Sequence, residues 1–206
     1  MKRQCFTKSM GDVPGITRII GILAEDSRAH WAWKLGIDGI DYREALRETV
    51  ETGNLVRELI YDFLNGERGD QMLDGYPLEV KDGATCCFEN FKKWWEHLNT
   101  NVRSRVVLLE HSMVSEKYLY GGTVDAVLVL DGEYVIVDFK IGDGGNESAY
   151  LQLAAYRQLL AENEELECKE ARVIRIPPNE DEKFEEYIMH DFETPWRIFQ
   201  NCLEIH

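Results

Sequence analysis

Three acidic residues and a lysine lie in one short stretch of this sequence and could together hydrolyse a phosphodiester. The acids are Glu110, Asp125 and Asp138, and Lys140 follows Asp138 with one residue between them. Paired carboxylates can hold a hard divalent cation that polarises a phosphate and lowers the pKa of a bound water. A lysine can orient that water or neutralise developing charge. The residue types therefore indicate metal-dependent phosphodiester chemistry.

An acid two positions before a lysine is common, so this triplet alone decides little. The sequence holds four such triplets, beginning at Glu79, Asp138, Glu167 and Asp181. Only Asp138 and Lys140 end a run typical of a buried strand, where residues i and i+2 point to the same face. A carboxylate and an ammonium beside an apolar core need partners. The pair is therefore either a structural ion pair or part of a site.

A tight turn predicts how the two aspartates meet. Asp131-Gly132 is a strong two-residue hairpin signal between the β-rich runs 122–130 and 133–139. Counting back equally from this turn sets Asp125 against Asp138. Facing carboxylates repel unless a cation lies between them, and Mg²⁺ or Mn²⁺ suits oxygen ligands without a histidine or thiol cluster. The alternative interpretation is that the two aspartates are ordinary solvated acids at a sheet edge. Glu110 is either a further metal ligand or a solvated acid at the end of a strand.

The elements that must position these residues follow from periodicity and breakers. Both faces of the second and third strands are mostly apolar, so we expect layers on both sides of the sheet. Gly53 is expected as a break or a close-approach point within a long helix. The expected helices are 16–23, 27–35, 42–64, 85–98, a helix ending near 161, and 195–203. The expected strands are 105–110, 122–130, 133–139, 170–176 and 184–190. Residues 66–83 are expected to form a loop.

This order predicts an α/β fold with a core of helix, three antiparallel strands, helix and strand, preceded by a helical addition. At 206 residues the chain is long enough for one domain with a full core. We expect a single domain over 1–206, with a helical part at 1–84 and an α/β core at 85–206.

Composition limits the partners and the compartment. The net charge of −15 argues against extended, non-specific wrapping of nucleic acid. Residues 1–40 nevertheless hold six basic groups against four acids, so a bound polyanion is expected toward the N-terminal half. No apolar run is long enough to cross a bilayer, and the five cysteines lack metal or disulfide spacing. We therefore expect a cytoplasmic protein with reduced thiols and no membrane association.

Taken together, the motifs resemble the PD-(D/E)XK nuclease superfamily, specifically its RecB-type and phage exonuclease-like branch. The resemblance covers roughly residues 105–160: Glu110, Gly-Gly-Thr-Val-Asp125, Val-Asp138-Phe-Lys140-Ile-Gly and Gln152-Leu-Ala-Ala-Tyr156. It implies a restriction-endonuclease-like core. It also implies that the two aspartates bind metal, that the lysine assists the nucleophilic water and that Glu110 is an accessory catalytic and metal-binding acid.

Further roles follow from the same resemblance. The backbone carbonyl of Phe139 is expected as a metal ligand, and Gln152 and Tyr156 are expected to support DNA binding. Many RecB-type members carry a metal-binding histidine where this chain has Arg57, which could instead meet a phosphate. Cys168 and Cys202 do not supply the quartet that an iron–sulfur cluster needs, so no cluster is expected.

The sequence thus predicts a Mg²⁺- or Mn²⁺-dependent deoxyribonuclease, more specifically an exonuclease of DNA recombination or repair. DNA is the expected partner, and a homo-oligomer or a recombination partner protein is possible for such a protein. A DNA-binding or structural module that has the nuclease fold but no cleavage activity is the alternative.

Overall fold

The computed structural model describes residues 5–7, 11–23, 32–67, 73, 75–101, 103–142, 147–179 and 181–206. Its centre is a five-stranded mixed sheet with the order β3-β4-β5-β6-β7. β3, β4 and β5 are antiparallel neighbours, β6 is parallel to β5, and β7 is antiparallel to β6. The strands are β3 (Ser104–Ser115), β4 (Tyr120–Leu130), β5 (Glu133–Ile141), β6 (Glu170–Ile176) and β7 (Glu185–Met189).

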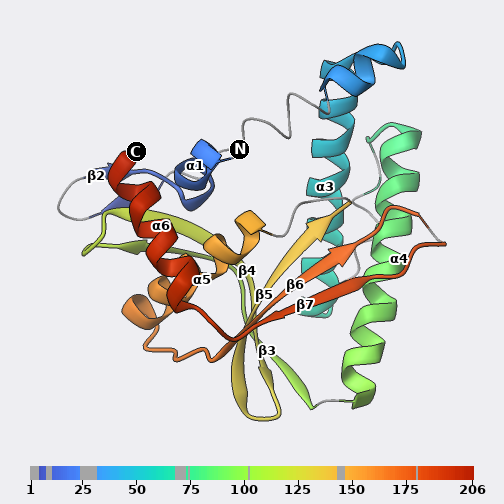
Figure 1. Cartoon of the computed structure of the whole chain (residues 1–206). Coiled ribbons are helices and arrows are strands. Elements are labelled where there is room, and N and C mark those ends of the chain that lie inside the picture. Colours follow the sequence, from blue (N-terminus) through green and yellow to red (C-terminus); the bar gives the residue numbers. More distant parts are fainter. Residues whose placement is uncertain are drawn as a thin grey trace.

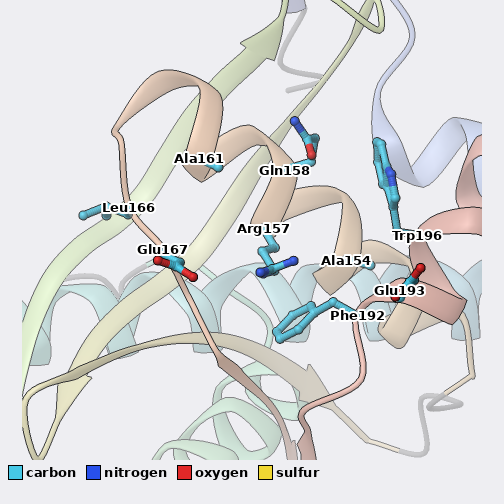
Figure 2. A pocket seen from close by; sticks show the side chains of 9 residues that line it. All are labelled: Ala154, Arg157, Gln158, Ala161, Leu166, Glu167, Phe192, Glu193 and Trp196. Carbon is cyan, nitrogen blue, oxygen red and sulfur yellow. The ribbon is translucent and has the colours of Figure 1, made fainter.

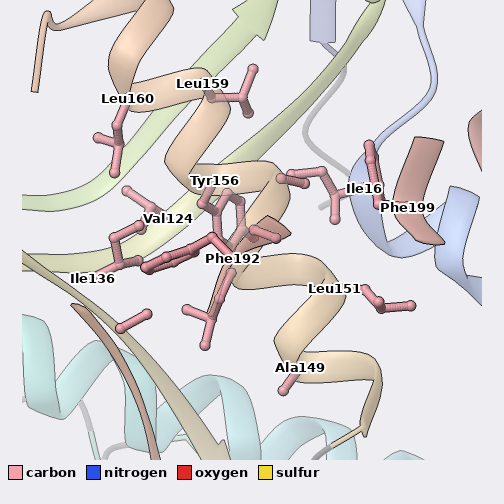
Figure 3. Close-up of a cluster of buried hydrophobic side chains, with 14 of the residues drawn as sticks. Ile16, Val124, Ile136, Ala149, Leu151, Tyr156, Leu159, Leu160, Phe192 and Phe199 are labelled. Atoms are coloured by element: carbon pink, nitrogen blue, oxygen red, sulfur yellow. The ribbon is translucent and has the colours of Figure 1, made fainter. Parts of the chain in front are cut away.

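Helices cover both faces of this sheet, as the two-sided apolar strands predict (Figure 1). One face carries α3 and α4, and the other carries α1, α5 and α6. Each face has its own buried apolar cluster, and Figure 3 shows the cluster around α5. The helices are α1 (Ile16–Ile20) with a 3₁₀ turn at Gly21–Leu23, α3 (Tyr42–Asn65), α4 (Leu78–Asn101), α5 (Glu147–Asn163) and α6 (Glu193–Ile205).

The chain order confirms the predicted fold class. α4 leads into the three antiparallel strands β3, β4 and β5, after which α5 crosses over to the parallel strand β6. The predicted hairpin is present, and Asp131 and Gly132 both have positive φ, as such a tight turn requires. Turn chemistry and strand patterning therefore predict the core correctly.

The long helices differ from the prediction at two points. α3 runs unbroken through Gly53, so the expected break does not occur there. It ends at Asn65, and the capping residue Gly66 has a φ of 77°, the left-handed conformation that favours glycine. α4 begins at Leu78, so the expected loop at 66–83 is wrong over its last six residues. Val80 and Ala84 are buried, and packing against α3 makes this polar, glycine-containing segment helical. The expected division at 84/85 falls inside α4.

The N-terminal segment packs on the sheet through a very close approach. β1 (Cys5–Thr7) and β2 (Gly11–Val13) form a small hairpin, after which Gly15 bridges to Gly121 of β4. A Cβ atom added at Gly122 would lie 2.6 Å from Ile16 Cδ1 and 2.8 Å from Tyr156 Cε1. The missing side chain at Gly122 therefore lets α1 and α5 approach β4. The helix expected at 27–35 lies partly outside the described residues, and residues 32–37 are helical.

Candidate active site

Asp125 and Asp138 meet where the β4–β5 ladder ends. The ladder runs from Leu130↔Glu133 to Ala126↔Val137, which confirms the predicted register up to the residues next to the two aspartates. Beyond the last pair of the ladder, the Phe139 amide donates to Asp125 Oδ2 at 2.9 Å, so a side-chain oxygen accepts this hydrogen bond in place of a backbone carbonyl. Figure 1 shows β3 and β4 curving toward α1 and α6 while β5 runs toward α3. The Asp125 carboxylate therefore lies between two diverging strands.

Asp138 and Lys140 form a largely buried ion pair. Lys140 Nζ is 2.7 Å from Asp138 Oδ2, and the exposed fractions of the two side chains are 21% and 3%. This contact confirms that the two side chains share a face of β5. Burying a carboxylate and an ammonium is costly unless each has further partners, so their other contacts matter.

The further contact of Lys140 comes from α5. Lys140 Nζ donates to Gln152 Oε1 at 3.0 Å, and Gln152 Nε2 donates to the Tyr156 hydroxyl at 2.8 Å. Tyr156 is 4% exposed. The four polar groups therefore form one continuous series of contacts from Asp138 to Tyr156, and α5 supplies the second partner of the lysine.

The site disfavours a second negative charge at Asp125. Burial is the largest cause and the nearby Asp138 the next, and together they raise the pKa of Asp125 from 3.8 to about 6. Arg57, Lys140 and the Phe139 amide oppose this rise. A divalent cation would remove the repulsion between the two carboxylates.

α3 contributes two residues to the same place. The Tyr61 hydroxyl donates to Asp125 Oδ1 at 3.3 Å, and burial together with the charges of Asp125 and Glu110 raises the pKa of Tyr61. Burial raises the pKa values of Asp125, Tyr61 and Tyr156, and the charge of Arg57, one turn earlier, is near enough to oppose each rise. Arg57 was expected at the site, whereas Tyr61 was missed; its spacing of four residues from Arg57 was the available signal.

Glu110 is in an unusual backbone conformation. The pairs Leu109↔Ala126 and His111↔Val124 set Glu110 against Asp125 on the neighbouring strand. Its φ of 45° is in the left-handed region that non-glycine residues rarely adopt, and such strain clusters at functional sites. The side chain is exposed. Its catalytic and metal-binding roles, and the role of the Phe139 carbonyl, stay predictions.

The residues present fit a divalent cation held by few protein ligands. Asp138 Oδ2 is buried and, apart from its ion pair with Lys140, has no hydrogen-bond partner among the described residues. Within that part of the chain, no group of three or more histidine, cysteine or acidic side chains could hold a metal. Mg²⁺ is commonly held by one or two carboxylates together with waters and substrate phosphates, so a pair of carboxylates such as Asp125 and Asp138 fits an ion of this kind.

A pocket between α5 and α6 lies apart from these residues (Figure 2). Arg157 lies within it, donates from Nε to the Cys168 carbonyl at 2.8 Å, and stacks over the ring of Phe192. Helical spacing places Arg157 on a different face of α5 from Gln152 and Tyr156. None of the predicted site residues lines this pocket.

The sheet order, the two helical layers and the acid–acid–lysine cluster define a restriction-endonuclease-like nuclease domain. The family model of the PD-(D/E)XK nuclease superfamily matches residues 32–200, and the chain belongs to this superfamily. Its members typically use divalent metal ions. No curated protein matches the chain. No helix among the described residues is long and apolar enough to cross a membrane.

Two solved structures illustrate the similarity of fold. A protein named "Putative exonuclease" from Eubacterium rectale shares 13% identity with a TM-score of 0.51, over 75% of this chain and 64% of its own. This chain thus spans less than two thirds of that protein. A second structure, that of SSO0001, shares 15% identity with a TM-score of 0.36 over 75% of each chain. At these identities the first similarity supports the fold alone.

Proposed function

We propose that this protein is a Mg²⁺- or Mn²⁺-dependent deoxyribonuclease whose metal is held by Asp125 and Asp138. The observation that carries the proposal is the Asp138 carboxylate: it is buried, it lies beside a second carboxylate, and its Oδ2 has only Lys140 as a partner among the described residues. A protein keeps two acids so placed at a cost in stability. Binding a cation during catalysis explains why that cost is tolerated.

Each residue of the cluster has a distinct task in this proposal. Asp125 and Asp138 bind the cation, which supplies Lewis-acid chemistry at the scissile phosphate. Lys140, held between Asp138 and Gln152, orients the attacking water and neutralises charge that develops on the phosphate. Arg57 offers a second positive charge on the α3 side, where a phosphate of the DNA can bind.

The proposed task of Gln152 and Tyr156 is to position Lys140. Their mutual hydrogen bond and the burial of Tyr156 support this task. Gln152 is half-buried and can also contact DNA, whereas Tyr156 would act through Gln152. A lysine fixed at both sides loses less entropy on reaching the transition state, because its geometry is already set.

An exonuclease of the RecB-type and phage-like branch, acting in recombination or repair, is the finer form of this proposal. The motif set from Glu110 to Tyr156 supports that branch. The E. rectale structure agrees with it at the level of the fold. A homo-oligomer or a recombination partner protein would suit such an enzyme.

Cleavage of linear and circular DNA with Mg²⁺ tests the proposal. Wild type is compared with Asp125→Ala and Lys140→Ala, and Lys169→Ala is the matched control. Lys169 belongs to another acid-x-lysine triplet and pairs with Glu133 on the surface, at 3.5 Å. We expect both site variants to lose activity and the control to keep it. An exonuclease would degrade the linear DNA and leave the circular DNA intact. Equal, metal-insensitive activity in all four proteins would overturn the nuclease assignment.

A further inference from the structure

Tyr61 reaches Asp125 from a different layer of the molecule. The two residues are 64 positions apart in the sequence, and the Tyr61 hydroxyl donates to Asp125 Oδ1 at 3.3 Å. The residue is 7% exposed and belongs to the apolar cluster on the α3 face of the sheet. A buried phenol needs a hydrogen-bond partner, and here the partner is a carboxylate of the candidate site.

Both oxygens of Asp125 are thereby engaged by donors from two different elements. Oδ1 accepts from Tyr61 of α3, and Oδ2 accepts from the Phe139 amide of β5. Two donors on the two oxygens fix the plane of a carboxylate, whereas one donor would let the group rotate about it. A carboxylate has about four lone-pair positions, so roughly two remain for other ligands.

The Phe139 amide links the Asp125 carboxylate to the part of β5 that carries Asp138. Phe139 lies between Asp138 and Lys140, so its amide ties Asp125 to the segment that carries the other half of the site. A cation shared by Asp125 and Asp138 requires the Asp125 plane to be held with respect to that segment. The Phe139 amide alone leaves this rotation open, and the Tyr61 hydroxyl closes it.

We propose that Tyr61 is a positioning residue that fixes the plane of the Asp125 carboxylate for a divalent cation shared with Asp138. The inference rests on the proposed function, because it assumes that the two aspartates hold a metal. Residues that hydrogen-bond to metal ligands commonly contribute about 10- to 100-fold to metal affinity. For a neutral phenol at 3.3 Å we expect the lower end of that range.

The test uses the full chain and Mn²⁺ alone, titrated into wild type and Tyr61→Phe by calorimetry. We expect Tyr61→Phe to bind Mn²⁺ about tenfold more weakly, and cleavage to need about tenfold more Mn²⁺ for half-maximal rate. At saturating Mn²⁺ we expect the cleavage rate of wild type, because the variant keeps both metal ligands and Lys140. Phenylalanine also keeps the ring in the apolar cluster, and circular dichroism checks that the variant is folded.

Tyr187→Phe is the matched control. The Tyr187 hydroxyl also donates to a carboxylate, that of Glu185, but β7 is separated from β5 by β6. We expect its Mn²⁺ affinity to equal that of wild type.

Three results would overturn the proposal while leaving the nuclease assignment intact. These are an unchanged Mn²⁺ affinity in Tyr61→Phe, a rate that stays low at saturating Mn²⁺, and a Tyr61→Phe protein that is unfolded. The first shows that Tyr61 does not act through the metal. The second shows that its hydroxyl acts in the reaction by a route other than metal affinity, and the third shows that it serves the structure. Wild type that neither binds Mn²⁺ nor cleaves DNA would overturn the proposed function, and this inference with it.

Discussion

Replacing Asp125 by asparagine should stabilise the metal-free protein while it removes activity. In the folded state, burial and the neighbouring Asp138 raise the pKa of Asp125 to about 6. The folded carboxyl therefore holds its proton up to about pH 6, whereas in the unfolded chain it releases it near its ordinary pKa of 3.8. The resulting destabilisation is absent well below pH 4, grows as the pH rises from 4 to 6, and is constant above that.

The magnitude follows from the size of this rise. A rise of about 2 pKa units corresponds to about 3 kcal/mol, at about 1.36 kcal/mol per unit. The Asp125 side chain is partly exposed, and solvent screening reduces this figure, so we expect about 1–2 kcal/mol. For a chain of this size, that corresponds to an unfolding temperature higher by roughly 2–8 °C.

The assay is thermal unfolding of wild type and Asp125→Asn in EDTA at pH 8 and at pH 5. We expect the gain in stability of the variant over wild type to be about half as large at pH 5 as at pH 8, because Asp125 of the folded wild type is already largely protonated at pH 5. Mg²⁺ should raise the unfolding temperature of wild type far more than that of the variant. Glu167→Gln removes the same charge from an exposed position and controls for general relief of the net charge of −15. A variant no more stable than this control at pH 8 in EDTA would refute the reasoning.

Two further predictions concern α5. Gly122→Ala places a Cβ atom 2.8 Å from the Tyr156 ring and should lower the free energy of unfolding by about 1–3 kcal/mol, measured by denaturant titration. A Cβ atom at Gly21 would have no atom within 4 Å, so Gly21→Ala should change the free energy of unfolding little. Equal effects of the two substitutions would contradict the close-packing explanation. Gln152→Leu removes one of the two acceptors of the Lys140 ammonium and should slow single-turnover cleavage about tenfold or more at saturating DNA and metal. A reduced DNA affinity with an unchanged rate would instead assign Gln152 to DNA binding.

The sequence determined the parts of the site that local chemistry controls. Asp131-Gly132 can adopt the left-handed backbone of a tight turn, and that turn fixes the register of the two strands beside it. Once the register is set, alternation along β5 places Asp138 and Lys140 on one face. The pairing of two acids with a lysine therefore followed from residues close together in the chain.

Only the tertiary structure decided what surrounds this cluster. Tyr61 reaches Asp125 across 64 residues, and Gln152 contacts Lys140, a partner that its position on the helix alone did not fix. The left-handed backbone of Glu110 and the divergence of β4 from β5 have no signature in the residue pattern. These features depend on how separate layers pack on the sheet. Periodicity indicates which face of an element is buried, whereas the neighbour that each side chain meets is set by contacts between segments distant in the sequence.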